Sequence, residues 1–207
     1  MIAYVKGELV QKQIGFVIID VGGIGYKVFM SEPSIEEIGN IGEQVKVHTY
    51  YKVSEDDISL FGFNTQEELR MFELLISVSG IGAKTAIAML ACIEPSQFAI
   101  AIISNDIDTL KKIPGVGPKS AQRIVLELKD KMKKEQQISE LTNATIEQKA
   151  KVKKVIVADT KVQEATDALQ VLGYTRKDIE KAIEQIDIAE MSVEDIIKKA
   201  LRELSMR

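Results

Sequence analysis

An internal repeat at an offset of 35 residues limits the choice of folds for this chain more than any other pattern in its sequence. Residues 79–86 read SGIGAKTA and residues 114–121 read PGVGPKSA. Each copy places two glycines around one apolar residue, follows them with a lysine and a hydroxyl side chain, and leads into a helix-forming run. The repeat predicts two equivalent glycine hairpins, each followed by a helix.

The chemistry of such hairpins is that of phosphate binding. Glycine permits a positive φ and lets a backbone approach a ligand closely, while the free N–H groups at a helix start attract an anion. Lysine and hydroxyl groups beside those N–H groups add charge and further donors. The candidate DNA-binding residues are Gly80, Gly82, Lys84, Thr85, Gly115, Gly117, Lys119, Ser120 and Arg123.

The repeat has three other interpretations. A nucleotide-binding P-loop requires glycine directly before the lysine, but Ala83 and Pro118 stand there, so ATP binding is disfavoured. Sequence-specific DNA reading is disfavoured as well, because backbone contacts to phosphates carry no base information. The third alternative is a pair of helix corners whose glycines serve packing only.

The charge is distributed unevenly along the chain. The whole sequence has a net charge of −4, yet residues 80–134 hold nine Lys or Arg and five Asp or Glu, a net of +4, which leaves −8 for the rest. The basic segment coincides with the glycine repeat, as expected for a nucleic-acid-binding region.

Residues 1–64 show short β-rich runs and alternating patterns, punctuated by glycines, which predict a small barrel of five or six strands. The Gly23-Ile24-Gly25 element is followed by a strand pattern rather than a helix, which excludes a dinucleotide fingerprint. The fold class we expect is multidomain α+β, beginning with this OB-like barrel.

Helical periodicity replaces the alternation from Thr65, which forms a capping box pattern with Glu68. We assign residues 65–142 to a tandem helix-hairpin-helix domain. The polar stretch 136–148 has no sustained apolar face and is interpreted as a tether, in part helical, with the flexible linker placed at 143–158.

Residues 159–207 carry three short amphipathic patterns that predict a three-helix, UBA-like bundle. The first pattern ends at Gly173, and Thr175 and Ser192 are the predicted caps of the second and third helices. So small a bundle buries little surface, so we expect some of its apolar residues to be exposed and available to a partner. The candidate partner-binding residues are Leu169, Leu172 and Tyr174, with plain core positions as the alternative for each.

Composition restricts the remaining possibilities. The single cysteine, Cys92, cannot form an intramolecular disulfide, and with one histidine, His48, it cannot form a usual zinc site. No apolar run reaches the roughly 18 to 20 residues of a membrane span, and the N-terminus does not resemble a signal peptide. We expect a cytoplasmic protein without metal or cofactor.

With these motifs in order, the chain resembles the RuvA family of Holliday junction branch-migration proteins over nearly its whole length. The matching stretches are residues 21–26, residues 60–63, both glycine hairpins and residues 168–174. The resemblance implies a homotetramer, or an octamer on DNA, that binds four-way junctions by shape. It also implies an acidic pin at Glu55 and Asp56, with Asp57 a less certain member, although Ser54 stands where the family often has a basic residue.

The resemblance further implies a non-catalytic subunit that recruits a hexameric ATPase, RuvB, and works beside the junction nuclease RuvC. Two other functional classes stay open at this point. One is a helix-hairpin-helix glycosylase or nuclease, which requires a base-flipping pocket or clustered carboxylates. The other is a protein-interaction adaptor that does not touch DNA and therefore shows no salt-dependent DNA binding.

Overall fold

The computed structural model describes residues 1–55, 57–143, 160–188 and 191–205. The chain divides into two compact units. The first comprises Met1–Ser77 with Ile81–Pro95, and the second Val78–Gly80 with Ser96–Arg207. The linker predicted at 143–158 lies outside the described residues except for its first position.

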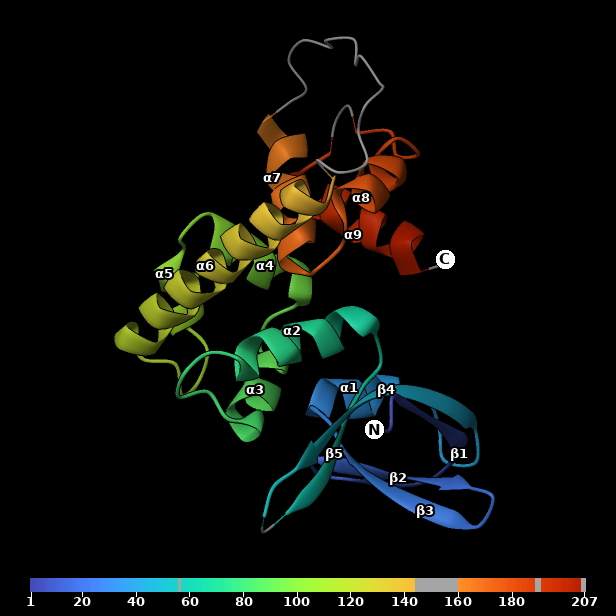
Figure 1. Cartoon of the computed structure of the whole chain (residues 1–207). Coiled ribbons are helices and arrows are strands. Elements are labelled where there is room, and N and C mark those ends of the chain that lie inside the picture. Colours follow the sequence, from blue (N-terminus) through green and yellow to red (C-terminus); the bar gives the residue numbers. More distant parts are fainter. Residues whose placement is uncertain (56, 144–159, 189–190, 206–207) are drawn as a thin grey trace. The chain divides into compact units, whose positions relative to one another are not determined.

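The first unit is built on a closed barrel. Its described strands are β1 (Tyr4–Gln13), β2 (Phe16–Val21), β3 (Ile24–Phe29), β4 (Gln44–Val53) and β5 (Ile58–Phe63). They close in the order β1-β2-β3-β5-β4 (Figure 1). The neighbours pair antiparallel except β3 and β5, which meet in parallel at Phe29 and Phe61. The predicted OB-like barrel is confirmed, with five strands among the described residues.

Alternation along the strands explains why the barrel has an apolar interior. In β1, exposed and buried residues alternate from Tyr4 to Val10, so one face of the strand turns inward. The inward residues of all the strands join Ile35 in a common core. Its buried members are Val5, Leu9, Val17, Ile19, Val28, Met30, Ile35, Val45, Val47 and Leu60.

The short helix α1 (Glu32–Glu37) between β3 and β4 is absent from the predicted elements. Ser31 is its N-cap and accepts a hydrogen bond from the Ser34 N–H, and a proline lies in the first turn. A helix of six residues is too short to show a periodic apolar stripe, so only this cap and Pro33 signal it in the sequence.

Helix α2 (Gln66–Ile76) packs against the barrel and is followed in the same unit by α3 (Ala83–Leu90). Phe72 is fully buried, with its ring centroid 4.9 Å from Phe63 and 5.4 Å from Phe61. The predicted capping box is confirmed, because the Glu68 N–H donates to Thr65 Oγ1 and the Thr65 N–H donates to Glu68 Oε2.

The second unit contains α4 (Pro95–Ile103), α5 (Ile107–Lys111) and the long helix α6 (Pro118–Asn143). α6 begins at Pro118, as its sequence predicts. It continues to Asn143, so the part of the polar stretch from Gln136 to Asn143 is helical, not a tether. Glutamine, glutamate and leucine favour a helix, and no glycine or proline interrupts this run, so a helix persists without an apolar stripe.

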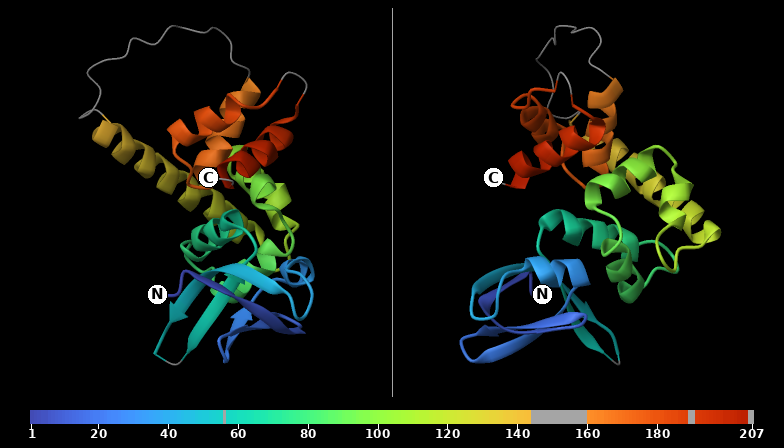
Figure 2. Two further views of the ribbon diagram at one scale, coloured as in Figure 1. Left: turned by 90° about the vertical axis from the view of Figure 1, so that its right-hand side faces the viewer. Right: turned by 180° about the vertical axis from the view of Figure 1, so that it is seen from behind.

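The helices α7 (Thr160–Val171), α8 (Arg176–Ile183) and α9 (Val193–Ser205) pack together, as the orange to red ribbons of Figure 2 show. Gly173 ends the first helix with a φ of +82°. Thr175 Oγ1 accepts from the Asp178 N–H, and Ser192 Oγ accepts from the Asp195 N–H. These contacts confirm the predicted start and stop signals.

Among the described residues, no single helix is long and apolar enough to cross a membrane. α3 and α4 satisfy the length and composition requirement only when the two are counted together as a bent pair.

Candidate nucleic-acid interface

The first glycines of the two hairpins adopt the same backbone conformation. Gly80 has a φ of +86° and Gly115 a φ of +83°. This left-handed region is disfavoured for L-residues because Cβ approaches the following carbonyl oxygen. The repeat in the sequence is therefore a repeat in conformation as well.

The second glycines precede the two helix starts. Gly82 is the N-cap of α3 and has no side chain to cap it, and the Ala86 N–H donates to its carbonyl at 3.0 Å. In the second copy the Ala121 N–H donates to the Gly117 carbonyl at 2.9 Å. The earlier N–H groups of each first turn have no acceptor within their own helix. Each corner thus presents backbone donors and the positive end of a helix dipole.

Both corners are open to solvent. The glycines Gly80, Gly82, Gly115 and Gly117 are all exposed. A Cβ at Gly82, Gly115 or Gly117 would meet no atom within 4 Å. An anion can therefore reach the backbone, which removes the most direct objection to a phosphate-binding role.

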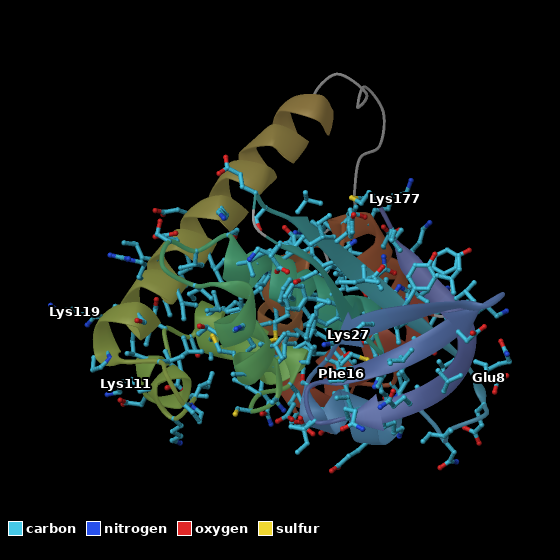
Figure 3. All side chains as sticks on the ribbon, turned by 90° about the horizontal axis from the view of Figure 1, so that it is seen from below. Glu8, Phe16, Lys27, Lys111, Lys119 and Lys177 are labelled. Atoms are coloured by element: carbon cyan, nitrogen blue, oxygen red, sulfur yellow. The ribbon has the colours of Figure 1, made fainter. Side chains whose placement is uncertain are left out.

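The side chains predicted to accompany the glycines are mostly exposed in each unit. Lys84, Lys119 and Ser120 are exposed and Thr85 is half-buried. Lys119 projects from the N-terminal turn of α6 at the edge of the view in Figure 3. Neither Lys84 nor Lys119 forms a salt bridge with another described residue. Their charges are therefore available to a ligand.

The apolar residues that flank the glycines anchor the corners. Val78, Ile113 and Val116 are buried, with exposed fractions of 2%, 4% and 6%. The Val116 N–H also donates to the Ile113 carbonyl at 3.0 Å, which closes the second turn. Packing therefore holds the apolar side chains inward while the glycines stay on the surface.

Before the second hairpin, Asp106 caps α5. Its carboxylate accepts from the Thr109 side chain and from the Thr109 N–H, the latter at 2.9 Å. These bonds, the side-chain bond first, lower the pKa of the Asp106 carboxyl. The acid therefore stays charged where it stabilises the helix start.

Arg123 lies beside the first hairpin, although it belongs to the second copy of the repeat. Its Nη1 donates to the Ser79 carbonyl at 3.2 Å and lies 3.6 Å from the position of a Cβ at Gly80. Glu127 is a residue that the sequence predictions missed: its Oε2 accepts from the Ser79 N–H at 3.1 Å. The four-residue spacing of Arg123 and Glu127 on one helix is the only sequence signal of this arrangement.

The predicted acidic pin lies in the hairpin between β4 and β5. Glu55 is exposed at its tip, whereas Asp56 lies outside the described residues. The Asp57 carbonyl accepts from both the N–H and the Oγ of Ser54, at 2.9 Å each, and its carboxylate accepts from Ser59. Asp57 is exposed but engaged in closing the loop, whereas Glu55 is exposed at the tip.

The expectation that Leu169 and Leu172 are exposed is wrong. Both have exposed fractions of 0% and are therefore buried in the three-helix bundle, in which α7 packs against α8 and α9. An amphipathic pattern identifies the apolar face of a helix but not whether another helix covers it. Tyr174 is half-buried. A role in partner binding stays a prediction for the surface around it.

Within the part of the chain that the structure describes, no group of three or more His, Cys, Asp or Glu side chains is placed to hold a metal ion.

Comparison with protein families finds three matches along the chain. Residues 1–62 match the RuvA N terminal domain, residues 72–130 match the SAM-like helix-hairpin-helix tandem, and residues 160–205 match the RuvA C-terminal domain. The matched segments correspond to the barrel, the two hairpins and the three-helix bundle.

Curated relatives resemble the chain over nearly its full length. A protein of Acetivibrio thermocellus is 49% identical, with 99% of each chain covered. A protein of Ruminiclostridium cellulolyticum is 43% identical over 99% of this chain and 100% of its own. A protein of Lachnospira eligens is 36% identical over 99% of each. All three are named Holliday junction branch migration complex subunit RuvA.

Proposed function

Because the chain belongs to the RuvA family, we propose that it is the DNA-binding, non-catalytic subunit of a branch-migration complex and holds four-way junctions open as a homotetramer. The observation that carries the proposal is the pair of exposed glycine corners with matching positive φ at Gly80 and Gly115. Each corner offers backbone donors and a lysine to a phosphate, and neither offers a means of reading bases.

Binding by these corners requires several copies. An anion at an exposed helix start contributes only about 0.3 to 1 kcal/mol, so a single corner is a weak site. Two corners in each protomer, repeated by fourfold symmetry, add up to a stable complex with a fourfold substrate. A second tetramer on the opposite face of the junction would form an octamer.

The acidic hairpin supplies the preference for junctions over duplex DNA. In a tetramer, four copies of Glu55 and Asp56 near the crossover repel phosphates and direct the separating strands outward. The corners thus hold the duplex arms while the pin keeps the crossing point open.

The C-terminal bundle is the part of the chain to which we assign partner binding. We assign to it the recruitment of the hexameric ATPase RuvB, which moves the DNA, in the cytoplasm and beside the junction nuclease RuvC. The match of residues 160–205 to the RuvA C-terminal domain supports a dedicated role for this segment.

A competition gel shift between a labelled four-way junction and duplex DNA tests the proposal across a salt series. We expect the wild-type chain to prefer the junction and its affinity to fall steeply with salt, because phosphate contacts release counterions. A double variant with Glu55→Lys and Asp56→Lys is expected to keep duplex binding and lose most of the preference for the junction.

Glu8→Lys is the matched control for this experiment, because Glu8 is an exposed acid elsewhere on the same barrel. It changes the net charge in the same direction without touching the pin. A double variant that prefers the junction as strongly as the Glu8→Lys protein would refute the pin. Wild-type binding that does not respond to salt would refute the phosphate contacts.

A further inference from the structure

Two side chains of α6 hold both backbone polar groups of Ser79, the residue directly before Gly80. Arg123 Nη1 donates to the Ser79 carbonyl at 3.2 Å, and Glu127 Oε2 accepts from the Ser79 N–H at 3.1 Å. Arg123 Nε also lies 4.0 Å from Glu127 Oε1. We call this arrangement the Ser79 clamp.

The two copies of the repeat differ at the position of the clamp. Pro114 occupies the position that corresponds to Ser79, and proline has neither a backbone N–H to satisfy nor a free φ. Ser79 lacks both restrictions: its N–H is free to donate to a side chain, and its φ is not fixed by a ring. Glu127 supplies the acceptor, and Arg123 holds the carbonyl of the same residue.

Glu127 is a negative charge at a surface that we propose binds phosphates. A carboxylate close to a phosphate-binding corner repels the ligand, so on electrostatic grounds alone its presence weakens binding. Glu127 is half-buried and its hydrogen bond to Ser79 is charge-assisted, the stronger kind of hydrogen bond. Its structural contact is a reason for an acid to stand at a basic surface.

We propose that Glu127 is a positioning residue for DNA binding: it fixes Ser79, and through it the left-handed Gly80, against the helix that begins at the second hairpin. This inference rests on the proposed function, since it assigns Glu127 a role in the same phosphate-binding surface. Arg123 both holds the Ser79 carbonyl and contacts a phosphate. A guanidinium has five N–H donors, so the bond to Ser79 leaves others for the ligand.

Replacement of Glu127 in the full-length chain separates positioning from simple electrostatics. Affinity for a labelled four-way junction is measured by fluorescence anisotropy over a salt series. We expect Glu127→Ala to bind about tenfold more weakly than the wild type, because the corner loses a charge-assisted bond. The slope against salt is expected to stay unchanged, because Glu127 itself contacts no phosphate.

Glu127→Gln and Asp130→Asn complete the comparison. Glutamine keeps an acceptor for the Ser79 N–H but loses the charge opposite Arg123, so we expect an intermediate affinity. Asp130 is an exposed acid on the same helix, and its replacement removes the same charge without touching Ser79. The Asp130→Asn variant is expected to bind junctions as tightly as the wild type or slightly more tightly. Glu127→Ala binding as tightly as Asp130→Asn would overturn the proposal.

Amide hydrogen exchange without DNA tests the clamp independently of binding. We expect the Ser79 and Gly80 amides to exchange faster in Glu127→Ala, while amides around the buried Phe98 keep their protection, which shows that the fold is intact. Unchanged exchange at Ser79 would overturn the clamp. A wild-type chain that fails to bind junctions would instead overturn the proposed function, and the exchange result would still decide the role of Glu127.

Discussion

Gly115 and Gly117 stand two positions apart in one corner, but their backbones make different demands on the residue. Gly115 has a φ of +83°, whereas the φ of Gly117 is not positive. Neither has an atom within 4 Å of the position of a Cβ, so a methyl group at either site meets no steric clash. Conformational strain and ligand access can therefore be separated by one pair of substitutions.

We predict that Gly115→Ala lowers the free energy of unfolding by about 1 to 2 kcal/mol, because the Cβ of alanine is strained in the left-handed conformation. Gly117→Ala is expected to leave stability unchanged or raise it by about 0.4 to 1 kcal/mol, because it restricts the unfolded chain. Both variants are expected to bind junctions more weakly, since each adds a Cβ beside the backbone N–H groups that would contact a phosphate. Denaturation followed by circular dichroism, with binding measured in parallel, checks the prediction. Equal stabilities for the two variants would contradict it.

Among the secondary-structure elements, the N-terminus of α2 contains an acid whose ionisation opposes folding. Burial raises the pKa of the Glu68 carboxyl above its usual range, and the bonds from the Thr65 and Asn64 N–H groups only partly offset it. The folded state therefore holds this proton more tightly than the unfolded chain does. Its contribution to stability is complete below the unfolded pKa and is lost as the pH rises through the folded pKa.

We predict that Glu68→Gln gains stability relative to the wild type as the pH rises from about 4 to about 7, because glutamine mimics the protonated acid. Glu43→Gln is the control of opposite sign. The N–H and side chain of Asn40 lower the pKa of Glu43, so that variant is expected to lose relative stability over the same interval. Tyrosine fluorescence reports on the barrel, since four of the five tyrosines lie between residues 4 and 51. Parallel trends for the two variants would contradict the assignment.

The same elements show what a sequence reveals and what it leaves open. The caps at Thr65, Thr175 and Ser192 were predictable because a cap involves residues only three positions apart. The closure of the barrel depends on a parallel contact between Phe29 and Phe61, which no local pattern specifies. A pattern of amphipathicity likewise identified the apolar face at Leu169 but not the helices that cover it.

For the candidate site, the repeat located both glycine corners because their conformation follows from residue type. Glu127 escaped notice because its partner, Ser79, lies 48 positions away, and its charge argues against a phosphate site. A long-range contact of this kind is fixed by tertiary packing. Sequence reasoning therefore located the two glycine corners and missed the acid that contacts Ser79.

In the molecule as a whole, the DNA-binding and partner-binding predictions fall on different parts of the chain. The basic charge is concentrated in residues 80–134, and the remainder is acidic. An acidic remainder keeps phosphates away from surfaces that do not bind them and leaves those surfaces free for protein partners. Substitutions in the C-terminal bundle should therefore leave junction binding intact.

We predict that Tyr174→Ala in the full-length chain keeps its junction affinity but weakens binding to the RuvB ATPase by more than about 1 kcal/mol, as half-buried aromatic residues at interfaces often do. Leu169→Ala serves as the comparison, since removing a fully buried leucine costs about 2 to 5 kcal/mol and unfolds the bundle. Pull-down with the ATPase, beside circular dichroism, separates the two effects. Tyr174→Ala that stays folded and recruits the ATPase as well as the wild type would place the partner surface elsewhere. Loss of recruitment in both variants, with the fold lost only in Leu169→Ala, would locate it at Tyr174.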